Sequence, residues 1–350
     1  MPSLVGSEMC IRDRHNTHLS IIIKLNIIKL EMNYKPIIIV SGEPYSVFLE
    51  IFFKIKKNKF KRPIILIVSK KLLCSQMKKL NFDFNINLID KDKIDYKKLN
   101  NKKINLIDVD FKFQKTFDKI TDKSNKYIKK SFNIALKLLK TNKFIGLING
   151  PISKKNFLKE KFFGITEYLA HQTKTKNFAM LIYNKSLSVC PITTHLPLKE
   201  VHKNISKKMI INKTILINSF YKKKFKKSPK IAITGLNPHC ESNYKSSEEK
   251  NIIIPSVDHV KKKGVKLDGP FAADTIFMAE HVKKYDVIIG MYHDQVLTPA
   301  KTLFGFEAIN ITLGLPFIRI SPDHGPNTAM LGKNLSSPKS LLKALNFLDL

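Results

Sequence analysis

Short runs of β-branched and aliphatic residues alternate with segments of helical spacing along most of this 350-residue chain. The first strand-type runs are residues 35–40, 62–68 and 104–109, and segments of helical spacing cover residues 47–54 and 71–80. Runs this short and apolar are typical of strands buried on both faces, which helices join into parallel sheets. The alternation predicts an α/β fold with a mostly parallel sheet and helices on its faces.

The same pattern continues to the C-terminal end of the chain. Residues 124–141 have the spacing of one long amphipathic helix, with Ser124 as its predicted N-cap, and residues 221–230 are expected to be a solvated helix end and linker. Polar segments follow most of the later strands, and ligands of parallel α/β sheets bind beyond the carboxyl ends of strands. Those later strand-type runs are residues 144–148, 178–182, 188–193, 230–234, 287–291 and 309–312.

The net charge of +34 is unusual and raises the alternative of a nucleic-acid or membrane partner. Only four of the 62 basic residues are arginine, namely Arg12, Arg14, Arg62 and Arg319. Nucleic-acid surfaces favour arginine for bidentate contacts, so the lysine excess is better explained by an AT-rich genome, and no nucleic-acid partner is expected. Arg319, the only arginine after residue 62, is predicted to need the planar guanidinium fork.

Cysteine usage and hydropathy indicate a cytoplasmic protein. The four cysteines form no C-x-x-C pair, which favours a reducing compartment over a disulfide framework. No run of about 18 uncharged apolar residues occurs, so no membrane span is expected. Residues 1–31 differ in composition from the rest and are predicted to be a non-native or disordered leader, with Met32 as the true start.

Three histidines lie in polar segments that each follow a strand-type run. They are His195, His239 and His293, spaced 44 and 54 residues apart, so no single helix or hairpin carries two of them. Three neutral imidazoles brought together from strand ends can hold a divalent metal with one position open for substrate. The alternative is that each is an ordinary polar residue, and the spacing alone leaves both readings open. Asp294 is placed to orient His293 from the second coordination shell.

Other polar residues indicate an anion site and a nucleotide site. Asn310 is suited to a hydroxyl or carboxylate, Arg319 and Lys301 to an anion, and Thr166 to a phosphate or hydroxyl. A surface role is the alternative for Lys301. The segment from 323 to 332 can cradle a nucleotide with backbone amides, although an ordinary turn cluster has the same composition. Neither G-x-G-x-x-G nor G-x-x-x-x-G-K-[ST] occurs.

These segments together resemble a known family in sequence and order. The chain resembles the 4-hydroxythreonine-4-phosphate dehydrogenase family of pyridoxal phosphate biosynthesis over roughly residues 32–350. The resemblance is densest from residue 145 to 332, and so many long segments in one order are highly specific. The matching segments are residues 149–154, 164–167, 194–198, 235–239, 268–270, 273–275, 292–295, 310–319 and 321–325.

The resemblance implies an isocitrate/isopropylmalate dehydrogenase-like fold of two α/β domains, in a homodimer whose active site lies at the subunit interface. Residues 32–150 and about 297–350 would form the NAD-side domain, and about 151–296 the metal, substrate and dimerisation domain. Members of that fold bind NAD without the Rossmann fingerprint. The implied cofactors are NAD or NADP and one divalent metal per subunit, zinc, cobalt or magnesium.

The resemblance also assigns roles to individual residues. It implies metal ligation by His195, His239 and His293, and substrate binding by Thr166, Lys301, Asn310 and Arg319. More loosely, it implies cofactor contacts by His324, Gly325 and Asn327. Asp294 and Asp274 are the candidates for the catalytic base, which the sequence leaves unidentified.

The implied reaction is NAD-dependent oxidation of 4-phosphooxy-L-threonine to 2-amino-3-oxo-4-phosphooxybutanoate. That β-keto acid then loses carbon dioxide to give 3-amino-2-oxopropyl phosphate. Two alternatives stay open: a phosphorylated threonate-like sugar acid as substrate of the same fold, and a basic nucleic-acid-binding protein.

Two departures from the family pattern concern the substrate side. Ile165 stands where the family usually has a histidine, and His171 is a speculative replacement. The loop after the first strand keeps Gly42, Glu43 and Pro44 but lacks the later glycines of the family. We therefore expect the backbone of this loop to approach a ligand less closely than in the family.

Overall fold

The computed structural model describes residues 34–158, 162, 164–240, 247–305, 307–322 and 324–349. The predicted leader at residues 1–31 and residue Asp323 of the predicted nucleotide loop lie outside the described residues.

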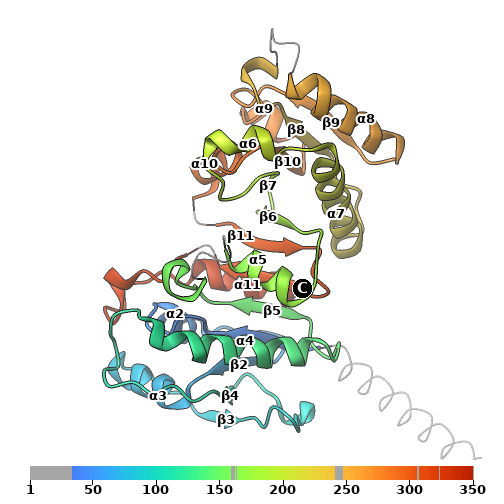
Figure 1. Cartoon of the computed structure of the whole chain (residues 1–350). Helices are drawn as coiled ribbons and strands as arrows, with labels where there is room; N and C mark the ends of the chain where they lie inside the picture. The colour runs from blue at the N-terminus through green and yellow to red at the C-terminus, as the bar shows by residue number, and fades with distance from the viewer. Residues whose placement is uncertain are drawn as a thin grey trace, which may run out of the picture.

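A single twelve-stranded sheet runs through the described part of the chain (Figure 1). Its strand order is β3-β4-β2-β1-β5-β12-β11-β6-β7-β10-β8-β9. We call the strands β3, β4, β2, β1, β5 and β12 the first half-sheet, and the strands β11, β6, β7, β10, β8 and β9 the second half-sheet. The strands are β1 (Ile37–Val40), β2 (Ile64–Val68), β3 (Ile86–Leu88), β4 (Ile104–Asp108), β5 (Gly146–Asn149), β6 (Ala179–Tyr183), β7 (Ser188–Pro191), β8 (Ile231–Thr234), β9 (Leu267–Phe271), β10 (Val287–Gly290), β11 (Ile309–Leu313) and β12 (Ile318–Pro322).

Strand direction changes only in the middle of this sheet. The first half-sheet is parallel throughout, and so is the block β7-β10-β8-β9. The antiparallel pairs are β12–β11, β11–β6 and β6–β7. The two parallel blocks therefore point in opposite directions, and the prediction of a mostly parallel α/β sheet is confirmed.

Helices cover both faces of the sheet because buried strands present apolar side chains to both sides. Alternate residues of β1 show this: Ile37 and Ile39 pack with α2, α3 and α11, whereas Ile38 and Val40 pack with α4 and α5. The first of these clusters continues under α7 and α8, and a third cluster packs α10 against the second half-sheet. The helices are α2 (Phe48–Ile55), α3 (Lys70–Lys79), α4 (Asn125–Leu139), α5 (Ile165–Gln172), α6 (Leu198–Asn204), α7 (Lys207–Phe225), α8 (Ile254–Lys262), α9 (Ala279–Val282), α10 (His293–Phe304) and α11 (Lys339–Asp349).

The predicted elements agree with the structure to within a few residues, with one change of detail. Ser124 is the residue before α4, as predicted, but its hydroxyl donates to Thr121 O at 2.9 Å and makes no side-chain cap. α7 ends at Phe225, within the stretch predicted to hold a helix end. The division into two domains at residues 150 and 297 stays a prediction.

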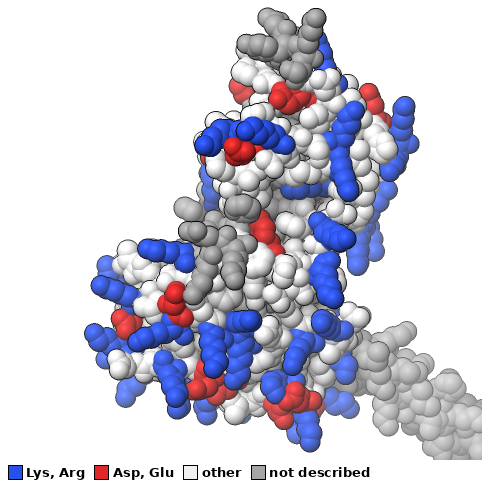
Figure 2. All heavy atoms as spheres, in the orientation of Figure 1, with Lys and Arg blue, Asp and Glu red and all other residues white. Residues whose placement is uncertain are grey.

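Basic side chains are scattered over the face of the molecule shown in Figure 2 and do not gather there into one strip. In the described part of the chain, no helix has the length and apolar character that crossing a membrane requires.

Candidate active site

Three neighbouring strands of the second half-sheet end just before the three predicted metal ligands. β7, β10 and β8 are adjacent and parallel. His195, His293 and His239 follow the carboxyl ends of these strands in the same order. Since the carboxyl ends of neighbouring parallel strands share one edge of a sheet, the fold places all three histidines along that edge.

His195 and His293 lie side by side, with ring centroids 5.8 Å apart. Two imidazoles that bind one ion through nitrogens about 2.0–2.1 Å from it have ring centres roughly 5–6 Å apart. His293 Nδ1 lies 2.7 Å from Asp294 Oδ1, so the carboxylate orients the ring and leaves Nε2 as the nitrogen available to a metal. The pair therefore has the chemistry and spacing of a metal site.

The third histidine does not complete a metal centre within one described chain. Among the described residues, no three His, Cys, Asp or Glu side chains converge closely enough to hold one ion. The structure thus brings His195 and His293 together and leaves the role of His239 a prediction.

Two of these histidines have an uncommon backbone conformation. His195 and His239 both have φ of 56°, in the left-handed region. Non-glycine residues seldom adopt it, and such strain persists only where the surroundings enforce it, often at functional sites.

Arg319 of β12 is the centre of a second, fully buried cluster. Its Nε donates to Asn149 Oδ1 at 2.7 Å, and its Nη1 donates to the hydroxyls of Thr166 at 3.1 Å and Thr312 at 2.9 Å. Burial lowers the pKa of the guanidinium to about 9, although nearby Glu167 opposes that shift. The directional contacts of Nε and Nη1 agree with the sequence prediction that this position needs arginine rather than lysine.

Two buried polar atoms in this cluster have no hydrogen-bond partner among the described residues. They are Arg319 Nη2 and Asn310 Oδ1. Asn310 and Thr312 lie on the same face of β11, and the strand register sets Thr312 opposite Arg319. A donor and an acceptor on one sheet face suit a ligand with both an anionic group and a hydroxyl or amine.

The N-terminus of α5 connects the arginine cluster to the histidine pair. Thr166 contacts Arg319, while the next residue, Glu167, accepts a hydrogen bond from Thr194 Oγ1 at 3.5 Å. A methyl group on Gly164 would lie 2.9 Å from Glu167 Oε2 and 3.4 Å from His195 Cε1. Predicted substrate and metal residues therefore adjoin within one chain.

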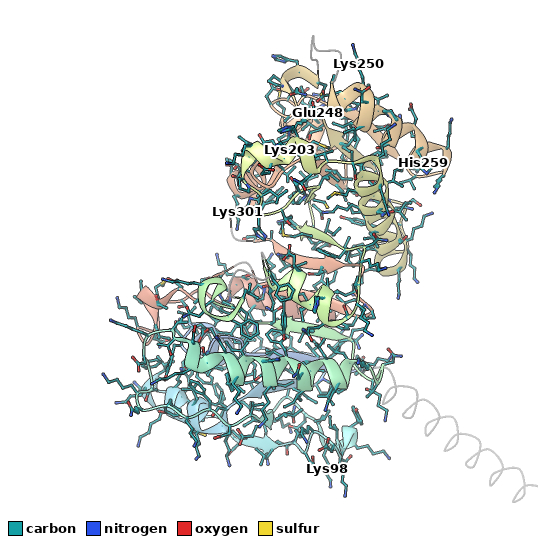
Figure 3. The ribbon with its side chains drawn as sticks, in the orientation of Figure 1. Lys98, Lys203, Glu248, Lys250, His259 and Lys301 are labelled. Atoms are coloured by element: carbon teal, nitrogen blue, oxygen red, sulfur yellow. The ribbon has the colours of Figure 1, made fainter. Side chains whose placement is uncertain are left out.

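Lys301 and the two candidate bases are less closely tied to this site. Lys301 lies on α10, two turns after His293 (Figure 3), and burial lowers its pKa. The Asp294 side chain is 80% exposed and is hydrogen-bonded to His293. Asp274 is exposed in the turn after β9. The identity of the base stays a prediction.

A cavity of about 500 Å³ adjoins the arginine cluster. Two of the three predicted cofactor residues, His324 and Gly325, line it, and Asn327 is not in its lining. Burial lowers the pKa of His324, and its Nε2 has no partner within the described ranges. The volume and the buried imidazole nitrogen suit a polar organic cofactor. The remaining lining residues are Asn149, Gly150, Pro151, Ile152, Ser153, Lys155, Leu158, Ile165, Ser321 and Pro326.

The departures noted in the sequence lie at this cavity. Ile165 lines it, whereas His171 is exposed and packs its ring 5.3 Å from that of Phe162, so His171 does not replace the missing histidine there. Phe48, in the segment that lacks the family glycines, stacks on His324 with centroids 6.3 Å apart. The Phe48 side chain therefore occupies space beside His324, next to the loop where the family has glycines.

Sequence reasoning missed three polar residues near the histidines. Lys213 of α7 donates to Pro191 O at 3.3 Å and Ile192 O at 2.7 Å, at the end of the strand before His195. Glu249 and Gln295 hold the loops of His239 and His293. Each of the three has partners more than ten residues away in the sequence, so no local pattern marks its role.

Comparison with known proteins identifies the relatives of this arrangement. A protein from Sulfurihydrogenibium sp. (strain YO3AOP1), named 4-hydroxythreonine-4-phosphate dehydrogenase, is 40% identical over 313 residues, covering 88% of this chain and 95% of the relative. The protein of the same name from Colwellia psychrerythraea is 33% identical over 89% of this chain and 96% of its own length.

Solved structures agree. The crystal structure of 4-hydroxythreonine-4-phosphate dehydrogenase from Klebsiella pneumoniae superposes with a TM-score of 0.78 and 26% identity, covering 90% of this chain and 98% of that one. The fold is shared with a terephthalate 1,2-cis-dihydrodiol dehydrogenase from Burkholderia xenovorans. The two proteins are 18% identical and superpose with a TM-score of 0.63, covering 91% of this chain and 98% of that one. The profile of the family described as "Pyridoxal phosphate biosynthetic protein PdxA" matches residues 59–348, and the chain belongs to that family.

Proposed function

We propose that this chain is an NAD- and divalent-metal-dependent 4-hydroxythreonine-4-phosphate dehydrogenase. The observation that carries the proposal is the junction at Gly164, where the His195–His293 pair meets the helix whose Thr166 contacts buried Arg319. The names of the relatives support a dehydrogenase of pyridoxal phosphate biosynthesis. The substrate would be 4-phosphooxy-L-threonine, and the final product 3-amino-2-oxopropyl phosphate after loss of carbon dioxide.

The residues divide the work by their chemistry. Arg319 Nη2 would donate to an anionic group of the substrate, and Asn310 Oδ1 would accept from its hydroxyl or amino group. His195 and His293, with His239, would hold the metal, and Asp294 keeps the His293 ring oriented. When bound, a divalent metal would supply Lewis acidity toward the substrate hydroxyl, and a nicotinamide cofactor would supply the hydride acceptor.

The cavity beside Asn149 would hold the nicotinamide cofactor, with His324 and Gly325 in its wall. His324 Nδ1 lies 3.1 Å from Gly325 O, which can only accept, so a neutral His324 presents Nε2 as an acceptor and suits ribose hydroxyls. We propose a cytoplasmic homodimer with the site at the subunit interface, in which His239 completes the metal centre.

The first test is direct. The full chain with NAD, a divalent metal and 4-phosphooxy-L-threonine should produce NADH, and a chelator should abolish that production. Zinc, cobalt and magnesium should be compared, because imidazole ligands favour the first two. No NADH under any of these conditions would overturn the assignment.

A phosphorylated threonate-like sugar acid is the second candidate substrate. Ile165 leaves room for it, because isoleucine stands where the family usually has a histidine and cannot donate to a substrate phosphate or carboxylate. The ratio of kcat/KM for the two substrates decides between them.

Replacing a histidine tests the metal centre. His239→Ala and His293→Ala should each weaken metal binding by at least about 100-fold, since changes even to supporting residues cost about 10–100-fold. His259→Ala is the matched control, because His259 is an exposed histidine on α8 (Figure 3). Metal affinity is measured by calorimetry, and unchanged affinity in His239→Ala would remove that residue from the site.

A further inference from the structure

Gln295 ties together the loops that carry His239 and His293. It is the third residue of α10, two residues after His293. Its Oε1 accepts from Met291 N at 2.6 Å and from Thr234 Oγ1 at 2.9 Å, while its Nε2 donates to Gly235 O at 2.8 Å. One side chain therefore joins the carboxyl end of β10 to that of β8.

Glu249 holds the next two residues of the His239 loop. Its Oε1 accepts from the backbone N–H groups of Leu236 at 2.8 Å and Asn237 at 2.9 Å. Its Oε2 accepts from Asn237 Nδ2 at 2.9 Å and Ser247 Oγ at 2.8 Å. The neighbouring Glu248, labelled in Figure 3, accepts from the same Asn237 amide at 3.0 Å. Glu249 itself is 1% exposed.

These contacts keep Glu249 ionised although it is buried. Burial by itself raises the pKa of this carboxyl, but the hydrogen bonds from Asn237 and Ser247 outweigh burial and lower the pKa to about 2. A carboxylate that accepts several N–H and O–H bonds holds its donors more firmly than a neutral group does.

We propose that Gln295 and Glu249 are positioning residues that set where His239 lies relative to His293, an inference that rests on the metal centre of the proposed function. Between them they fix four successive residues, from Thr234 to Asn237. His239 follows two residues later with a left-handed backbone. Its imidazole therefore leaves a loop whose base is held both to the strand end before His293 and to the start of the next helical segment.

Loss of the hydrogen bonds of either Gln295 or Glu249 should weaken metal binding in the full chain. Gln295→Met keeps the length of the side chain and removes its three hydrogen bonds, and Glu249→Gln replaces an acceptor oxygen by a donor facing Asn237 or Ser247. Each variant should raise the Kd for Co²⁺, measured by calorimetry without substrate or NAD, by about 10–100-fold.

Matched controls separate positioning from general stability. Gln76 is a buried glutamine on α3 that donates to Pro44 O and Thr116 O, and Glu50 is a buried glutamate on α2 that accepts from Lys54 Nζ and Ser336 N. Gln76→Met and Glu50→Gln should lower the melting temperature and leave the Kd for Co²⁺ within about twofold of the unchanged chain, since neither contacts the histidine loops.

A second measurement covers variants that fold poorly. Gln295→Glu keeps the Oε1 acceptor and sets a second carboxylate oxygen against Gly235 O in place of the donor. It should fold, bind Co²⁺ about tenfold more weakly, and show faster amide hydrogen exchange in residues 234–240. Lower melting temperatures with an unchanged Kd and unchanged exchange would reduce both residues to a structural role and overturn the inference.

The inference and the proposed function can fail separately. If the unchanged chain binds Co²⁺ but produces no NADH, the proposed reaction is wrong, but the Kd values for Co²⁺ still test the positioning role. If the unchanged chain binds no Co²⁺, the inference is overturned. If it is an active enzyme whose Kd is insensitive to both substitutions, only the inference fails.

Discussion

Arg319→Lys should lower kcat/KM for NADH formation by about a thousandfold, because truncating one partner of a buried charged contact costs roughly 2–5 kcal/mol. A lysine ammonium keeps the charge but cannot reproduce the fork that reaches Asn149, Thr166 and Thr312 at once. It also removes Nη2, the donor proposed to face the substrate. Steady-state kinetics on the purified variant measure the loss.

The matched control is Arg62→Lys. Arg62 is the other arginine within the described ranges. It is half-buried, and its contacts include Lys35 O, 3.5 Å from Nη1, and the Tyr34 ring, whose centroid is 5.8 Å from the guanidinium carbon. We expect its kcat/KM to stay within about twofold, because none of these contacts involves a residue of the candidate site. A loss of less than tenfold in Arg319→Lys would show that positive charge suffices at the site and that the fork is dispensable.

Glu43→Gln should stabilise the protein, and the gain should grow with pH. Burial raises the pKa of Glu43 from 4.5 to about 7, a shift that the nearby Ser124 side chain reduces only in part. Because the folded-state pKa is raised, the stability from this group is fully present below pH 4.5 and is lost as pH rises through about 7. Glutamine cannot ionise, so it avoids the loss.

The expected gain in the free energy of unfolding is roughly 2–3 kcal/mol at about pH 8 and close to zero at about pH 4. Urea denaturation at both pH values measures it. Glu50→Gln is the control of opposite sign: Glu50 is also buried, but it accepts from Lys54 Nζ at 2.9 Å and Ser336 N at 2.6 Å, so its loss should destabilise. A Glu43→Gln gain that is equal at both pH values would contradict a charge-burial origin.

Features encoded in short local patterns could be predicted from the sequence. The strand-type runs before His195, His239 and His293 predict that each histidine follows the end of a strand. The structure has strands there, β7, β8 and β10, and they are neighbours in the sheet. Arg319 was singled out by composition alone, and its buried fork of hydrogen bonds supports that interpretation.

Features that depend on remote partners could not be predicted. Gln295 and Thr234 are 61 residues apart, and Lys213 reaches carbonyls 21 and 22 residues away. The sequence marks Arg319 but not the strand β12 that carries it. β12 forms a local hairpin with β11, but its pairing with β5 joins residues about 170 positions apart, and no local pattern encodes that contact.

The place of β11 and β12 in the sheet has a consequence for synthesis of the chain. These strands lie between β5 and β6, yet the ribosome makes them after every other strand. Until residues 309–322 emerge, β5 and β6 each expose an unpaired edge, the kind of surface on which nascent chains misassociate. The same segment brings Asn310 and Arg319, so the nascent polypeptide gains these two proposed substrate-binding residues only as the two halves of the sheet are joined.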